Sequence, residues 1–236
     1  MDIFIQLDTW IALLTLTFLE IVLGIDNIIF ISIVAGRLPE HQQKKARLIG
    51  LSLALIVRIF LLMGITWLIG LTKPVLTVSS FEFSWRDIIL FVGGLFLIAK
   101  STSELHHKIE GNVHETEVKH VSAFGSAIFQ IVLLDIIFSF DSILTAVGLT
   151  NQITLMIIAV IVSIIVMIIF SGLISAFINK HPTLQVLALS FLILIGFMLA
   201  VEAFHYHVPK GYIYFAVFFS LIVEVINIKV RKKVLR

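Results

Sequence analysis

The stretch Leu19–Ile28 reads LEIVLGIDNI and places two acids, Glu20 and Asp26, inside a long apolar run. The 236-residue chain around it is 59% apolar and 14% charged, whereas soluble domains average about 45–50% apolar and 25% charged residues. This composition excludes an ordinary cytosolic enzyme and indicates a polytopic membrane protein. Because one span needs about 20 residues, the length holds seven spans and leaves no room for a soluble domain.

A second stretch repeats the first one 115 residues later. Leu134–Ile143 reads LDIIFSFDSI and again carries two acids six residues apart, Asp135 and Asp141. The third and sixth predicted spans also end alike, with a Glu followed three residues later by a His. A repeat of three helices enters the membrane from opposite sides in its two copies. We therefore predict an all-α protein with a 3+3 inverted repeat plus one extra helix: a single membrane domain over 1–236, with repeat one at about 7–107, repeat two at about 121–207 and the extra helix at 211–228.

Apolar runs and polar breaks predict seven membrane helices: Ile11–Val34, Leu48–Leu71, Arg86–Lys100, Ala123–Leu149, Ile153–Phe177, Leu184–Phe204 and Tyr212–Ile228. A long loop, Thr72–Trp85, separates the second from the third. The third has the shortest apolar core and spans a membrane only if it runs on to Glu104. With seven spans, 13 of the 17 Lys and Arg residues lie on one side of the membrane and three on the other. The positive-inside rule then places the N-terminus outside and the C-terminus in the cytoplasm.

Each of the two acidic helices offers several oxygen donors on one face. At about 100° per residue, Glu20, Gly24 and Asn27 form one stripe of the first helix. Asp135 and Ser142 lie on the matching stripe of the fourth, and Asp26 and Asp141 lie one residue to the side of these stripes. Oxygen donors suit hard cations such as Mn²⁺, Mg²⁺ or Ca²⁺. Gly24 also suggests a local break in the first helix, which an unbroken helix would refute.

Counter-charges complete the candidate site. Arg58 lies midway along the second span, and Lys100 ends the apolar core of the third. Four acids and Arg58 leave a charge of −3 when all are ionised, and one divalent cation or two protons reduce this to −1. That balance is typical of a metal/proton exchanger. The alternative is that Arg58 and protonation neutralise the acids, which then only fix helix packing.

The paired acidic stretches, Arg58 and the segment Lys100–His106 resemble the TerC family of bacterial integral membrane proteins, which is grouped with LysE-type exporters. The resemblance covers about residues 7–228. It implies a bacterial inner-membrane location, an association with manganese efflux or with metal supply to exported enzymes, and cation binding by six residues: Glu20, Asp26, Asn27, Asp135, Asp141 and Ser142. Val132 departs from the family, because many relatives carry a further acid there. The name of the family refers to tellurium resistance, for which the sequence offers no explanation.

We therefore expect an exporter of a divalent cation, with Mn²⁺ as the first candidate and protons as the counter-ion. The ion is the substrate, and no organic cofactor and no nucleic acid is expected. The sequence lacks the HExxH and GxxxxGK[ST] patterns of metalloproteases and ATP-driven proteins, so we do not expect an enzyme. Two alternatives stay open: a small-solute exporter, and a non-transporting partner that hands metal to exported enzymes. A homodimer and a metal-sensing role for the His- and Glu-rich segment 104–120 also stay open.

Overall fold

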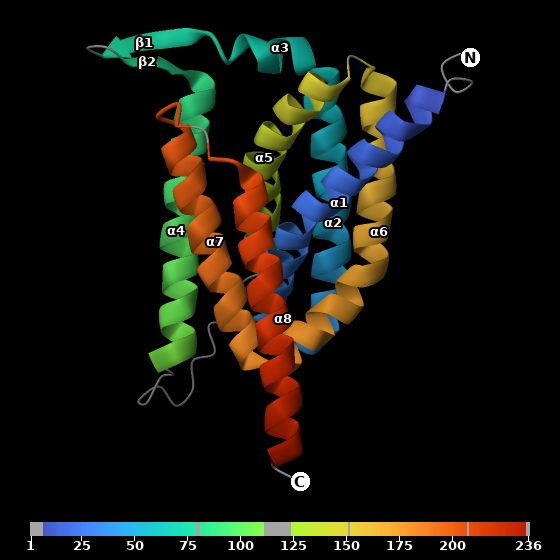
Figure 1. The fold of residues 1–236 in the computed structure, drawn as a ribbon, viewed down its shortest axis with the longest axis vertical. Helices are drawn as coiled ribbons and strands as arrows, with labels where there is room; N and C mark the ends of the chain where they lie inside the picture. The colour runs from blue at the N-terminus through green and yellow to red at the C-terminus, as the bar shows by residue number, and fades with distance from the viewer. Residues whose placement is uncertain (1–6, 79–80, 111–123, 151, 207, 235–236) are drawn as a thin grey trace.

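The computed structural model describes residues 7–78, 81–110, 124–150, 152–206 and 208–234. Within these ranges, seven helices are long and apolar enough to cross a membrane, as the sequence predicted. They stand side by side as one bundle, with the two chain ends at opposite ends of it (Figure 1). The seven are α1 (Leu7–Gly36), α2 (Glu40–Met63), α4 (Trp85–Glu110), α5 (Phe124–Leu149), α6 (Ile153–Lys180), α7 (Pro182–Glu202) and α8 (Lys210–Val234).

The segment between α2 and α4 has structure that the sequence analysis missed. The predicted second span ran to Leu71, but α2 ends at Met63 and a separate short helix, α3, covers Ile65–Gly70. Two antiparallel strands follow, β1 (Pro74–Val78) and β2 (Phe81–Ser84). Gly64 separates the two helices, and Ile65 and Leu68 of α3 are still buried in the core. The hairpin lies across the end of the bundle in Figure 1 and forms no part of the span region.

Two sequence-based expectations about single helices have opposite outcomes. The expectation that the third span runs on past Lys100 is confirmed, because α4 continues to Glu110. The expectation of a break at Gly24 is wrong, because α1 is one continuous helix from Leu7 to Gly36. At about 1.5 Å per residue a helix of 30 residues is longer than the bilayer is thick, and α1 crosses the bundle at a slant in Figure 1. A long helix fits a membrane by tilting, so a break is not needed.

The helices meet in a regular pattern of neighbours. The most extensive contacts join α4 to α7 and α1 to α6, followed by α2 to α5 and α2 to α6. In an inverted repeat, α1 would correspond to α5, α2 to α6 and α4 to α7. Under this exchange the α1–α6 contact becomes the α2–α5 contact. The α4–α7 and α2–α6 contacts are unchanged. An inverted repeat would relate these contacts in this way, but among the described residues the α1–α2 contact has no α5–α6 counterpart of similar extent, and the 3+3 repeat stays a prediction.

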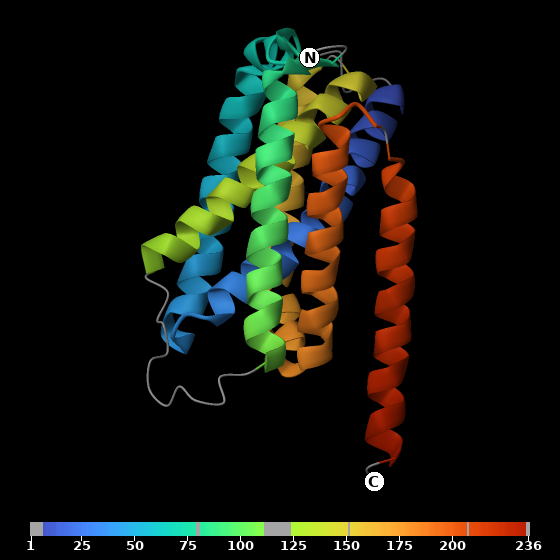
Figure 2. The ribbon, with the colours of Figure 1, turned by 90° about the vertical axis from the view of Figure 1, so that its left-hand side faces the viewer.

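The extra helix α8 stands apart from the other six. Figure 2 shows it beside the bundle, and its last turns extend past the ends of its neighbours. Its main contact is with α7, and most of its large apolar side chains are exposed. Such a helix buries its apolar surface in lipid or against another protein. The core that positions the acidic stretches is therefore built by α1, α2, α4, α5, α6 and α7.

Candidate functional site

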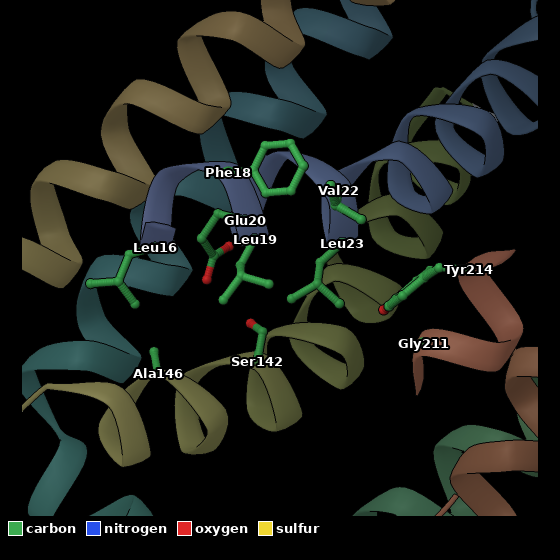
Figure 3. Close-up of a pocket in the computed structure, with 10 residues that line it drawn as sticks. All are labelled: Leu16, Phe18, Leu19, Glu20, Val22, Leu23, Ser142, Ala146, Gly211 and Tyr214. Carbon is green, nitrogen blue, oxygen red and sulfur yellow. The ribbon is translucent and has the colours of Figure 1, made fainter. Parts of the chain in front are cut away.

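Glu20 lies in the middle of α1 and is only 5% exposed. Its carboxylate points into a cavity of about 400 Å³ between α1, α5 and α8, and Ser142 of α5 points into the same cavity (Figure 3). The remaining walls are largely apolar and include Leu16, Leu19 and Tyr214. The cavity therefore leads from the side of α8 to a buried carboxylate at the centre of the bundle.

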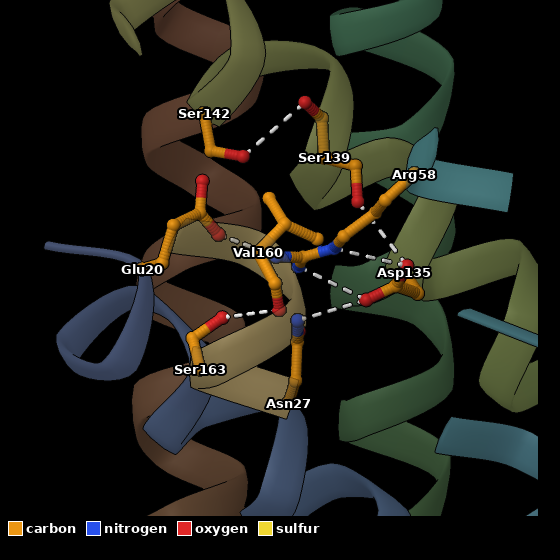
Figure 4. Close-up of polar contacts among 8 residues, drawn as sticks. All are labelled: Glu20, Asn27, Arg58, Asp135, Ser139, Ser142, Val160 and Ser163. Atoms are coloured by element: carbon orange, nitrogen blue, oxygen red, sulfur yellow. Dashed lines mark hydrogen bonds and ion pairs between the residues drawn. The ribbon is translucent and has the colours of Figure 1, made fainter. Parts of the chain in front are cut away.

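Arg58 of α2 connects the two acidic helices. Its side chain is 2% exposed, and its guanidinium donates from Nη1 to Oε2 of Glu20 at 2.5 Å. The same group donates to both carboxylate oxygens of Asp135, from Nη2 at 3.0 Å and from Nε at 3.3 Å. A guanidinium is suited to this role because its planar fork of donors matches a carboxylate in two places at once. The guanidinium of Arg58, which belongs to α2, thus bridges α1 and α5 (Figure 4).

Asp135 is the acceptor at the centre of this network. Besides the two bonds from Arg58, it accepts a hydrogen bond from Nδ2 of Asn27 at 3.2 Å and one from Oγ of Ser139 at 3.2 Å. Ser142 donates to the main-chain carbonyl of Ser139 at 3.3 Å, one turn further along α5. A buried carboxylate is stable only when such donors compensate for the lost water. Four donors meet that requirement for Asp135.

The structure brings four of the six predicted ligands to one place: Glu20, Asn27, Asp135 and Ser142. Their helices cross there because the acidic stripes of α1 and α5 both face the interior. Asp26 and Asp141 belong to the same two helices, but their side chains lie outside the part that the structure describes. Their roles stay predictions.

Lys100, the second expected counter-charge, has a different partner. Its ammonium lies 3.1 Å from Oε1 of Glu104 on the next turn of α4, and Glu104 also forms an ion pair with Arg37. These three charges tie α4 to the end of α1. Among the described ion pairs, none connects Lys100 to Glu20 or Asp135. Arg58 is therefore the counter-charge that the structure places in the acidic network.

A contribution from α6 was not predicted from the sequence. Ser163 is fully buried and donates to the carbonyl of Val160 at 2.9 Å, and Figure 4 draws both residues together with Glu20, Asn27 and Arg58. A serine in the middle of the most hydrophobic helix is the signal that could have identified it. The helix pattern alone could not show that this face of α6 packs on α1.

Two other clusters of titratable residues do not form metal sites in the described residues. At the hairpin end of the bundle, Glu202 binds Arg86 at 2.7 Å, and Oδ2 of Asp87 lies 3.1 Å from Nε2 of His205. These contacts hold α4 to the C-terminal end of α7. Of the His- and Glu-rich segment, residues 111–120 lie outside the described residues. No group of three or more His, Asp and Glu is arranged for a metal among the residues that can be described.

Comparison with known proteins identifies relatives along the whole chain. The model of the "Integral membrane protein TerC family" matches residues 5–235. The "UPF0053 inner membrane protein YgdQ" of Escherichia coli K12 is 52% identical over 226 residues, which are 96% of this chain and 95% of that protein. A "UPF0053 protein" of Haemophilus influenzae is 49% identical over 226 residues, 95% of each chain.

One relative is about twice as long. The "UPF0053 inner membrane protein YoaE" of Escherichia coli K12 is 48% identical over an alignment of 237 positions, which covers all of this chain and 46% of that protein. No solved structure matches the chain at a significant level. The family model, the relatives and the seven apolar helices agree on a multi-pass inner-membrane protein. The chain belongs to the TerC family of integral membrane proteins.

Proposed function

We propose that this protein exports a divalent metal cation, with Mn²⁺ as the best candidate, in exchange for protons. The observation that carries the proposal is the guanidinium of Arg58, buried between Glu20 and Asp135 at the centre of the bundle. Ionisable residues at this depth are costly to bury and are typical of ion pathways. The proposal assigns no enzymatic activity to the chain.

The donor chemistry supports a cation of the hard class. Carboxylates of Glu20 and Asp135, the amide of Asn27 and the hydroxyl of Ser142 are all oxygen donors, as Mn²⁺ and its harder neighbours prefer. Asp26 and Asp141 are the proposed central ligands, and Glu20 and Asp135 are flanking ligands or proton carriers. No cysteine competes for softer metals, because the sequence has none.

Arg58 supplies the charge that replaces the cation. The four acids and Arg58 sum to −3 when all are ionised, so a divalent cation or two protons leave −1. While Arg58 binds Glu20 and Asp135, the oxygens that it occupies are not free for a metal. A cation that binds Asp135, or Oε2 of Glu20, would therefore weaken one of these ion pairs, and its release lets Arg58 return. This competition would couple the cation to a rearrangement of α1 against α5.

The proposed direction follows from the charge distribution. The C-terminus is assigned to the cytoplasm because 13 of 17 Lys and Arg residues fall on that side. The start of α1 and the end of α8 lie at opposite ends of the bundle, as an odd number of spans requires (Figure 1). Export would then carry the cation from the basic end of the bundle to the end with the β1–β2 hairpin.

Flux through the purified protein in liposomes tests the proposal. Mn²⁺ movement and internal pH would be followed with dyes in the wild-type chain, in Asp141→Asn and in Glu224→Gln, a carboxyl change on the exposed helix α8. We expect Mn²⁺ and protons to move in opposite directions, with Asp141→Asn inactive and Glu224→Gln unchanged. Asp26→Asn is expected to abolish flux in the same way while the folded protein is retained.

Two other outcomes would replace this function by the alternatives. Mn²⁺ binding without any flux would identify a non-transporting partner that hands metal to exported enzymes. If the protein neither binds nor transports Mn²⁺, a metal function is contradicted altogether and a small-solute exporter is favoured. Flux at the wild-type rate in Asp141→Asn would contradict the assignment of Asp141 to the transport site, even if transport itself is observed.

A further inference from the structure

A methionine sulfur lies against the acidic stripe of α1. Gly24 lies between Glu20 and Asn27 on this stripe, and a Cβ at Gly24 would be 2.4 Å from Sδ of Met167 and 3.0 Å from its Cε. The thioether therefore occupies the space that any side chain at Gly24 would fill. Met167 belongs to α6 and is 2% exposed. Because Glu20, Gly24 and Asn27 share one face of α1, the sulfur lies against this face at the level of Gly24, between the positions of Glu20 and Asn27 along the helix.

We propose that Met167 supplies a thioether ligand to the transported cation, so that transition-metal dications and Cd²⁺, rather than Mg²⁺ or Ca²⁺, form the substrate class. This inference rests on the proposed function and adds the residue that sets its selectivity. Ser163 lies one turn earlier on the same helix and is fully buried, so α6 presents an oxygen and a sulfur to α1 (Figure 4 shows Ser163).

Oxygen donors and a thioether donor prefer different cations, and this difference defines the substrate class. Mg²⁺ and Ca²⁺ take oxygen ligands, whereas thioethers bind softer metals. A mixed set of carboxylates and one thioether keeps a place for Mn²⁺ and improves the binding of softer dications relative to alkaline-earth ions. The sequence has no Cys and five Met, so a sulfur ligand in this protein can only be a thioether.

The position of Met167 also differs from that of an ordinary core methionine. A flexible Met often fills irregular gaps in a core, and Met156 on the same helix is equally buried at 2% exposed. Of these two methionines, only Met167 contacts Gly24. Met156 therefore provides a matched control with the same residue type, helix and burial.

The test is cation selectivity of the full chain in liposomes. Initial rates for Mn²⁺, Cd²⁺ and Ca²⁺ would be measured for the wild type, Met167→Leu and Met156→Leu, since Met to Leu conserves volume and is well tolerated in cores. We expect the Cd²⁺/Ca²⁺ rate ratio to fall about tenfold in Met167→Leu, the lower end of the effect of altering a metal site. Met156→Leu should keep the wild-type ratio.

A second variant moves the sulfur without removing it. In Gly24→Ala the new methyl group would meet Sδ of Met167 and displace the end of this flexible side chain. The selectivity ratio should fall in the same direction as in Met167→Leu. The double variant should be no worse than the stronger single one, because both changes act on one contact.

A spectroscopic measurement checks the ligand directly. X-ray absorption at the cadmium edge of the Cd²⁺-loaded protein should show a sulfur neighbour in the wild type and in Met156→Leu, but not in Met167→Leu. An unchanged selectivity ratio in Met167→Leu, or a wild-type spectrum without sulfur, overturns the inference while the proposed cation transport stands. Absence of divalent-cation flux and binding in the wild type overturns the proposed function, and this inference with it.

Discussion

The bundle contains two central helix contacts that are held in opposite ways. At the centre of α1, α2 and α5, Arg58 joins Glu20 to Asp135 through buried charges. Between α4 and α7, Gly94 and Gly196 face each other, and the two backbones come close because neither residue has a Cβ. The first contact can change with the protonation or cation load of its carboxylates, while the second depends only on shape. The contact between α1, α2 and α5 is therefore expected to change with its ligands. The contact between α4 and α7, called the α4–α7 seam below, is expected to stay the same.

The largest expected effect comes from removing Arg58. Arg58→Leu leaves Glu20 and Asp135 buried without a cation, and breaking a buried pair in this way costs about 3–5 kcal/mol. The free energy of unfolding in mixed micelles would measure the loss. Arg47→Leu is the matched control, because Arg47 makes one long hydrogen bond to Ser175, at 3.4 Å, and should cost less than about 1 kcal/mol.

A compensating variant sharpens this first prediction. If the cost in Arg58→Leu comes from unpaired carboxylates, then adding Glu20→Gln and Asp135→Asn should restore part of the stability. A triple variant that is no more stable than Arg58→Leu would show that packing of the long Arg58 side chain, rather than its charge, holds α1 to α5. The same unfolding measurement decides between the two.

An intermediate effect is expected at the α4–α7 seam. Gly94→Ala places a methyl group 2.5 Å from the carbonyl oxygen of Gly196, and such overpacking against backbone typically costs about 1–3 kcal/mol. Gly172→Ala on α6 is the control, because a Cβ there meets nothing within 4 Å. Thermal unfolding should separate the two variants. Equal stability of both would contradict the direct backbone contact.

The smallest effect is expected at the hairpin end of the same seam. Glu202→Gln removes the ion pair with Arg86. The side chain of Glu202 is 12% exposed and that of Arg86 is 22% exposed, and ion pairs near the surface contribute about 0–1 kcal/mol. The loss of stability should shrink further at high salt, because ions screen exposed charges. Phe204→Ala, which removes edge contacts to Phe83 and Phe91, should not depend on salt. A salt-independent loss in Glu202→Gln would contradict an electrostatic role.

Much of the fold could be read from local patterns. Apolar runs predicted seven spans, and the structure has seven helices that could cross a membrane. The segment Thr72–Trp85 was predicted only as a loop, because strands of five and four residues are too short to stand out as a pattern between two long apolar helices. The break at Gly24 was wrong for another reason, since a glycine that permits unwinding also permits the close approach of Met167. Only the neighbouring helix decides between these two roles.

The amino-acid sequence is enough to show that Glu20, Asp135 and Arg58 must face the interior, because they are too costly to leave in lipid. Their pairing depends on how the helices pack. Helix tilt and rotation bring Arg58 to two carboxylates on different helices, carry Lys100 to Glu104 instead, and set Met167 against Gly24. Hydropathy and helical period are properties of single segments, whereas the contacts of Arg58 and Met167 join residues that lie tens to more than a hundred positions apart.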